Sequence, residues 1–229
     1  RRSLSAAQSD NLARAVERLG PSYVKIGQFL ATRPDVVGDV FARDLALLQD
    51  RMPTFPRALA VAQIEASLGR PIDMLFKSFG EPIAAASIAQ VHPAEIEVDG
   101  VRRTVAVKVI RPGVRERFAK DLETNYALAD LQVRFHPPAR RLKPIEVTRT
   151  LEQTTKVEMD LRLEAAALSE LGENAADDPG FRVPKVDWER TGRDVVTMEW
   201  VDGIKMSDIE GLKAAGHDLE KLAETLIQS

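Results

Sequence analysis

One lysine in an apolar run has the clearest chemical potential in this chain. Lys108 lies in Val105-Ala106-Val107-Lys108-Val109-Ile110, whose β-branched residues predict a strand. Burying an unpaired ammonium group costs several kcal/mol, so an inward-facing Lys108 would need an anionic partner or ligand. The alternative is that Lys108 lies on an edge strand and extends its amine into water.

The residues in front of this strand are rich in alanine. We call residues Ile83–His92 the alanine loop. The pattern predicts a strand, a tight loop, a strand, an Asp99-Gly100 turn and then the Lys108 strand. Protein kinases use this order to cover and pair the phosphates of ATP, with glycines in the loop. Alanine instead limits positive φ and keeps the backbone farther from a phosphate, so we predict an altered nucleotide site. Its candidate contact residues are Ile83, Ala84, Ala85, Ala86, Ser87, Ile88, Ala89, Gln90, Val91 and Lys108.

Three carboxylates, Glu158, Asp160 and Glu164, lie close together in a segment predicted to be one long helix from about Glu146 to Leu171. On a regular helix Asp160 and Glu164 would share a face, whereas Glu158 would lie about 200° from Asp160. Glu164 is the expected partner of Lys108, because kinases pair this lysine with a glutamate on an adjacent helix. The alternative is a solvated face with ordinary i,i+4 ion pairs.

The segment Lys25-Ile26-Gly27-Gln28 places a glycine inside a predicted helix, at a cost of about 1 kcal/mol relative to alanine. A close helix crossing at Gly27 would explain it, and does not exclude that Lys25 and Gln28 form a polar face directed at a ligand. We expect Lys25 to lie close to Glu158 or Asp160. Glu158 is favoured, because Asp160 would share its face with Glu164.

Helices are predicted first and strands second, which indicates an α+β fold. The predicted helices run through Leu12, Val16 and Leu19 and over about 22–31, 35–52, 56–68, 114–135 and 146–171. The predicted strands lie within 83–110 and on both sides of the Thr191-Gly192 turn, up to Val201.

Composition argues against several classes of site. Lysine and arginine total 32 against 35 acidic residues, a net charge of −3, which argues against a nucleic-acid-binding surface spread over the domain. The absence of cysteine excludes disulfides and thiolate metal sites. The three histidines lack metal-ligand spacing with carboxylates and are expected to be structural or surface residues. No metal ligand is therefore predicted within the chain.

The ends suggest part of a longer protein. The first residue is Arg1, and apolar residues at helical spacing continue almost to Ser229. No apolar run approaches the ~20 residues that span a bilayer.

Three segments together resemble the UbiB family of atypical kinase-like proteins, also called aarF-domain-containing kinases. They are Lys25-Ile26-Gly27-Gln28, the alanine loop, and Glu158-Met159-Asp160 followed by Glu164. The resemblance implies a kinase-like N-terminal lobe, with an antiparallel sheet and a long helix, at 81–200. A helical extension would occupy 1–80, and 201–229 would begin a C-terminal lobe that is largely missing.

The resemblance also implies residue roles. Lys108 and Glu164 would be the phosphate-orienting ion pair. Lys25 and Gln28 would belong to an extension that enters the active site, with Glu158 and Asp160 as partners.

Its implied cofactors are ATP or ADP and Mg²⁺, whose ligands are expected beyond Ser229. Family members hydrolyse ATP slowly and support ubiquinone biosynthesis near membranes. The implied partners are lipid or quinone precursors and other quinone-biosynthesis proteins. The implied location is the cytoplasmic side of the bacterial inner membrane or the corresponding organelle membrane. Membrane contact is expected only in a longer protein, and the chain itself is expected to be soluble.

The segment Met198-Glu199-Trp200-Val201 fits a kinase interlobe hinge, so Met198, Glu199 and Val201 are candidate adenine contacts. The 28 residues after Val201 contain neither a catalytic loop nor an Asp-Phe-Gly segment. The chain alone is therefore expected to be inactive. The leading hypothesis is an atypical kinase or ATPase of quinone biosynthesis. The alternatives are a nucleotide-responsive pseudokinase that organises lipids or biosynthetic proteins, and a purely structural helical scaffold.

Overall fold

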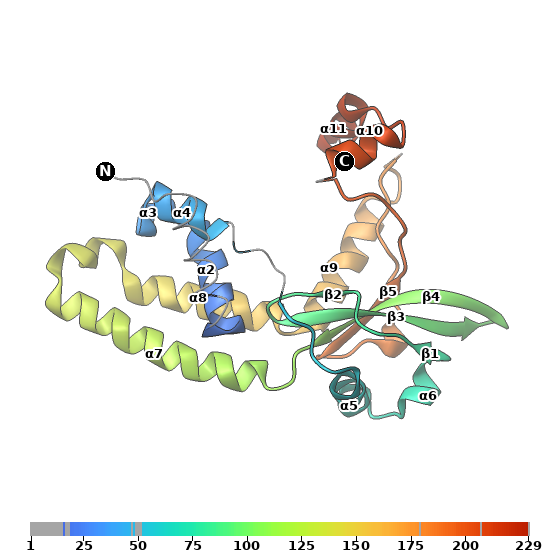
Figure 1. Cartoon of the computed structure of the whole chain (residues 1–229), viewed down its shortest axis with the longest axis horizontal. Helices are drawn as coiled ribbons and strands as arrows, with labels where there is room; N and C mark the ends of the chain where they lie inside the picture. The colour runs from blue at the N-terminus through green and yellow to red at the C-terminus, as the bar shows by residue number, and fades with distance from the viewer. Residues whose placement is uncertain are drawn as a thin grey trace.

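The computed structural model describes residues 16, 19–46, 48, 52–178, 180–206 and 208–228 (Figure 1). Its described part contains a five-stranded antiparallel sheet with helices on both faces and a long helical hairpin that extends to one side. The predicted α+β class is confirmed. The predicted helix through Leu12, Val16 and Leu19 lies mostly outside the described residues. The domain boundaries at residues 80 and 200 stay predictions.

Three short helices lie between Pro21 and Ala46: α2 (Pro21–Ala31), α3 (Pro34–Val37) and α4 (Asp39–Ala46). The prediction of one helix over 35–52 is wrong, because Gly38 has a φ of +86° and ends α3. The predicted close crossing at Gly27 is confirmed. A Cβ on this residue would collide with the side chain of Leu48 and would lie 3.5 Å from Leu45 Cδ2.

Two helices cover one face of the sheet, α5 (Arg57–Leu68) and α6 (Ile72–Leu75). α5 agrees with the helix predicted over 56–68, and it ends at Gly69, whose φ of +68° gives a left-handed cap. Ala60 and Ile64 of α5 are fully buried against the sheet.

The strands form one open sheet. They are β1 (Ser78–Phe79), β2 (Ala84–Ala85), β3 (Ala89–Val98), β4 (Val101–Ile110) and β5 (Val195–Glu199), in the order β1-β3-β4-β5 with β2 also paired to β3. The predicted Asp99-Gly100 turn joins β3 and β4, with both residues at positive φ as a tight hairpin requires.

Successive side chains of β4 point to opposite faces of the sheet, and each face has its own hydrophobic core. Val105, Val107 and Val109 face α5 in one core, whereas Ile110 belongs to a second core on the other side of the sheet. Lys108 shares its face with Ile110, so its side chain emerges toward the second core. That core includes Leu161 and Ala165.

A long hairpin follows β4. It consists of α7 (Val114–Phe135), a short 3-10 helix η1 (Pro137–Leu142) and α8 (Pro144–Glu158), and it reaches well away from the sheet (Figure 1). The predicted helix over 114–135 is confirmed by α7. In the described part of the chain, no helix is both long and apolar enough to cross a membrane.

The predicted single helix over 146–171 is wrong, because two helices, α8 and α9 (Leu161–Asn174), meet at a break. Asp160 is extended at the break, and its side chain accepts a hydrogen bond from the backbone N–H of Arg162, which makes it the N-cap of α9. Arg115 of α7 donates to the Met159 carbonyl, and the Leu161 N–H donates to the Arg193 carbonyl at 3.0 Å. The break is therefore held by neighbouring elements on both sides.

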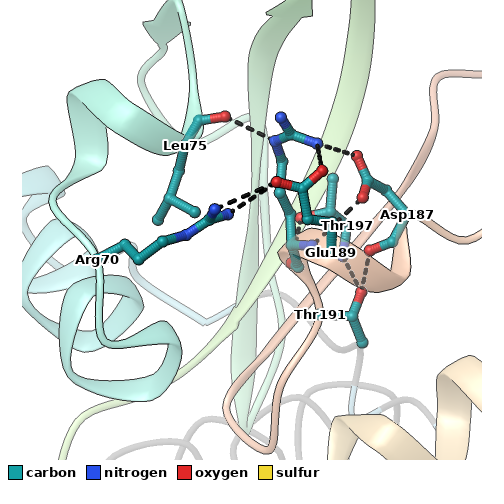
Figure 2. A network of polar contacts seen from close by, with 7 residues as sticks. Arg70, Leu75, Asp187, Glu189, Thr191 and Thr197 are labelled. Carbon is teal, nitrogen blue, oxygen red and sulfur yellow. Dashed lines mark hydrogen bonds and ion pairs between the residues drawn. The ribbon is translucent and has the colours of Figure 1, made fainter. Parts of the chain in front are cut away.

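The strand predicted before Thr191-Gly192 is replaced by a 3-10 helix, η2 (Trp188–Arg190), and a single bridge from Val186 to Met198. A polar network occupies this region (Figure 2). Arg190 donates to the Leu75 carbonyl at 2.7 Å and to Asp187 at 2.8 Å, which ties α6 to η2. Beyond β5 lie α10 (Ile209–Ala214) and α11 (Leu219–Gln228).

Candidate functional site

Lys108 pairs with Glu164 across the second core. Its Nζ donates to Oε1 at 2.8 Å and to Oε2 at 2.7 Å of this carboxylate, which lies in the first turn of α9. β4 lies between β3 and β5, so the edge-strand alternative for Lys108 is wrong. The Lys108 side chain is 26 % exposed and that of Glu164 is 36 % exposed, so the pair is open to a ligand from one side.

A second ion pair lies beside the first. Lys25 Nζ of α2 is 2.5 Å from Oε2 of Glu158, the last residue of α8. This oxygen has no hydrogen bond of regular geometry, so the contact is an ion pair by distance. The prediction that Lys25 contacts Glu158 in preference to Asp160 is confirmed, but its reason was wrong. Asp160 is turned away because it caps α9, not because it shares a helix face with Glu164.

Both pairs line one cavity of about 420 Å³, which we call the two-lysine cavity. Four separate elements supply its charged groups: α2, β4, the end of α8 and the start of α9. The remaining lining residues are Ala86, Ser87, Ile88, Ala89, Val157, Leu163 and Ala167. The structure thus brings the centre of the alanine loop to the two lysines.

Several expected site residues do not line this cavity. Asp160 is bound by Arg162, at 2.9 Å from Nε and 2.6 Å from Nη2, and this hydrogen bonding lowers the pKa of Asp160. Gln28 lies one turn along α2 from Lys25 and is also outside it. Its expected role is therefore not explained by the cavity.

The hinge residues also lie apart from the cavity. Met198 packs against the second core, and Val201 is exposed. Glu199 forms an ion pair with Arg182 at 2.7 Å, and its backbone N–H donates to the Lys185 carbonyl at 2.8 Å. Their expected adenine contacts stay predictions.

The residues at both ends of the alanine loop do not line the cavity and instead make strand pairings and buried hydrogen bonds. Ile83, Ala84, Ala85 and Val91 belong to the β2–β3 pairing and its flank. The buried Gln90 side chain accepts from the Phe55 N–H at 2.9 Å and donates to the Phe55 carbonyl at 3.1 Å. It also lies 2.8 Å from His92 Nε2.

These bonds fix the state of His92. Both Gln90 amide hydrogens are donated, so His92 Nε2 accepts one, and His92 Nδ1–H donates to the Gly80 carbonyl at 2.9 Å. Burial lowers the pKa of His92, more than the hydrogen bond to Gly80 raises it. The expected structural role of this histidine is confirmed.

Sequence reasoning missed Arg111 as a residue of the site. Its Nε donates to the Ala86 carbonyl at 2.9 Å. Its position three residues after Lys108 is the sole sequence signal, and that signal does not indicate which carbonyl it binds.

The chemistry of the donors suits phosphate better than a metal ion. Two ammonium groups can bind phosphate oxygens, and the cavity volume falls within the usual range for small-molecule sites. Among the described residues, no group of three or more His, Cys, Asp or Glu could hold a metal ion. Glu158 and Glu164 are each paired with lysine, so the described carboxylates do not fit a magnesium site. A larger cavity of about 570 Å³ between α2, α7 and α8 is lined by no lysine, arginine or carboxylate.

Comparisons with known proteins identify the family of the chain. Residues 47–229 match the ABC1 atypical kinase-like domain. The chain is 41 % identical over 219 residues to "Probable protein kinase UbiB" of Marinobacter nauticus, covering 95 % of this chain and 40 % of that protein. The proteins of the same name from Vibrio vulnificus and Aeromonas hydrophila are 43 % and 44 % identical, over 94 % and 92 % of this chain and 39 % and 38 % of theirs. The chain therefore spans about two fifths of these relatives, and it belongs to the UbiB family of ABC1 atypical kinase-like proteins.

Proposed function

We propose that the chain supplies the first half of the nucleotide site of an atypical kinase or ATPase. The observation that carries this proposal is the Lys108–Glu164 pair inside a cavity bordered by the alanine loop. Kinases hold the corresponding lysine with a glutamate so that its ammonium group meets nucleotide phosphates. ATP bound here would supply the phosphoryl group.

The proposed roles follow from the contacts. Lys108 would bind a phosphate oxygen of ATP or ADP, and Glu164 would hold the Lys108 ammonium group in position. Lys25 would bring a second positive charge into the cavity, and Glu158 would orient it. Ala86 and Ser87 would limit how closely the nucleotide approaches the loop backbone. Magnesium ligands would have to come from residues beyond the described ones.

We propose further that the activity serves ubiquinone biosynthesis at a membrane, on the cytoplasmic side of a bacterial inner membrane or the corresponding organelle membrane. The support is the family resemblance. Lipid or quinone precursors and other biosynthetic proteins would then be the partners, and no nucleic-acid partner is proposed.

The second candidate is a nucleotide-responsive pseudokinase that organises such partners. One observation favours it: the alanine loop carries alanines where catalytic kinases have glycines. A protein of this kind would bind nucleotide without efficient phosphoryl transfer.

Isothermal titration with ATP and ADP, with and without magnesium, tests the proposal. The 229-residue chain should bind weakly or not at all, whereas a protein extended past Ser229 to the length of its relatives should bind with magnesium. Tight magnesium-dependent binding by the 229-residue chain would contradict the half-site assignment. Absence of binding by the extended protein would contradict both candidates, and binding without ATP turnover would favour the pseudokinase.

A further inference from the structure

Arg111 binds the centre of the alanine loop and does not line the two-lysine cavity. It directly follows Ile110, the last residue of the strand that carries Lys108. Its backbone N–H donates to the Ile88 carbonyl at 2.8 Å, and its Nε donates to the Ala86 carbonyl at 2.9 Å. These two carbonyls flank Ser87, which is 2 % exposed. One residue therefore holds both sides of the loop's turn.

A second nitrogen of the same guanidinium group binds a different segment, Met52–Phe55, which we call the backing segment. Arg111 Nη2 donates to the Pro53 carbonyl at 2.8 Å, and its guanidinium carbon lies 5.5 Å from the centre of the Phe55 ring. The Arg111 side chain thus connects the alanine loop to the chain that leads into α5.

Two further contacts join the loop to the backing segment. The Met52 N–H donates to the Ala85 carbonyl at 3.3 Å, and the Gln90 side chain binds both the N–H and the carbonyl of Phe55. The alanine loop is therefore connected to the backing segment at three residues, Ala85, Ala86 and Gln90.

We propose that Arg111 is a positioning residue that holds the alanine loop against the backing segment, and so fixes the loop backbone at the rim of the two-lysine cavity. Its guanidinium group does not line the cavity, so it acts through Ala86 and Ser87, which do. The Ala86 carbonyl is engaged by Arg111 and cannot turn toward a ligand without breaking that bond. The part of this inference that concerns a nucleotide rests on the function proposed above.

A fixed loop changes the cost of binding. A mobile loop loses conformational freedom when a ligand orders it, whereas a loop already held in place avoids most of that loss. Arg111 should therefore strengthen nucleotide binding without touching the nucleotide.

The substitution Arg111→Lys distinguishes the effect of the positive charge from that of the guanidinium shape. A guanidinium group presents several donors in a planar fork and stacks on aromatic rings, whereas a lysine amine is a single compact charge. Arg111→Lys keeps the positive charge but cannot bind Ala86 and Pro53 while it also stacks on Phe55.

Arg57 provides a matched control. Its Nε donates to the Phe79 carbonyl at 2.9 Å, and its guanidinium carbon lies 5.5 Å from the centre of the Phe79 ring. It thus makes the same two kinds of contact as Arg111, at a carbonyl outside the alanine loop. Phe79 also stacks on His92 at the end of the loop, so Arg57→Lys controls both for stability and for that contact. It should lower stability by a similar amount and leave the bonds at Ala85 and Ala86 in place.

Hydrogen–deuterium exchange of the 229-residue chain, read on peptides that cover residues 83–92, is the first measurement. The amides of Ile83 and Ala86 donate to Val91 and Ala89 at 2.9 and 2.8 Å, so they report on the loop. They should exchange about tenfold faster or more in Arg111→Lys, because a charge-assisted hydrogen bond is lost. Exchange in Arg57→Lys should match the unaltered chain. Equal loop exchange in Arg111→Lys and the unaltered chain, or equal acceleration in both variants, would overturn the inference.

ATP titration of the extended protein is the second measurement. Arg111→Lys should weaken ATP binding about threefold or more, and Arg57→Lys should leave it unchanged. Faster loop exchange with unchanged affinity would overturn the positioning role. If the unaltered extended protein binds no nucleotide, the proposed function fails, while the exchange comparison still decides whether Arg111 holds the loop.

Discussion

The two cations of the cavity each lie against a carboxylate from a different helix. Lys108 makes two hydrogen bonds with Glu164, and Lys25 contacts Glu158. Each partner limits where its lysine can place the ammonium group. If the ammonium positions determine turnover, loss of either member of a pair should have nearly the full effect of losing both.

We therefore expect Lys108→Ala and Glu164→Ala each to lower ATP turnover of the extended protein about tenfold or more, with the double variant losing little more. Steady-state ATPase assays of the three variants measure this. Lys213→Ala is the control, because Lys213 forms an exposed ion pair with Glu210 far from the cavity in sequence. Fully additive losses would instead describe two independent charges.

At this scale the sequence predicted both lysine–glutamate contacts, since an ammonium group on an apolar strand has few alternatives to a carboxylate. It did not predict that Asp160 would cap α9 and lie outside the two-lysine cavity. An aspartate in mid-helix and one at an N-cap look alike when the neighbours predict helix on both sides. The role of Arg111 was missed for a related reason. It binds backbone carbonyls, which every residue has, so the residue types of its partners do not reveal the contact.

At the level of the elements, α2 can pack closely against α4 and the residues that follow it because Gly27 has no side chain. Gly27 lies where a Cβ would collide with Leu48. The same helix carries Lys25, so its packing sets the position of one cation of the cavity.

Gly27→Ala should lower the free energy of unfolding by about 1 kcal/mol. The overpacking cost of about 1–3 kcal/mol exceeds the gain of about 1 kcal/mol in helix propensity. The matched control is Gly172→Ala in α9, where the new Cβ would lie an ordinary 3.6 Å from Val183 Cβ and the propensity gain should remain. Urea denaturation of both variants measures the difference. Equal stabilisation by the two substitutions would contradict the close crossing.

Element types were predicted well where a local signal was strong. The Asp99-Gly100 hairpin, the Gly69 cap and the span of α7 needed only local sequence. The break between α8 and α9 depends on Arg115 and Arg193, which are distant in sequence, so helical periodicity continued through it.

For the molecule as a whole, His92 links folding to pH. It is fully buried, stacks on Phe79 with ring centres 4.5 Å apart, and accepts a hydrogen bond from Gln90 only while neutral. The pKa of His92 is lowered in the folded chain, so the unfolded chain binds more protons below the ordinary value of 6.5. Stability from this group is complete above about pH 6.5 and is lost as pH falls toward the folded-state pKa.

Unfolding free energies measured by urea titration between pH 5 and 7 should therefore decrease toward pH 5. The slope from this residue should be at most about 1.4 kcal/mol per pH unit. His92→Asn should lower stability at pH 7 and flatten the slope, whereas His217→Asn, at an exposed position, should keep it. A slope that persists in His92→Asn would assign the pH dependence to other groups.

The pairing of both lysines also has a kinetic consequence. Two ammonium groups and two carboxylates cancel, so the rim of the cavity offers an approaching anion almost no long-range attraction. Electrostatic steering, which accelerates association with charged clefts and weakens in salt, would be small here. A polyanion would enter at an ordinary diffusional rate that changes little with ionic strength, and the positive charges of the two lysines would act on it only at close range.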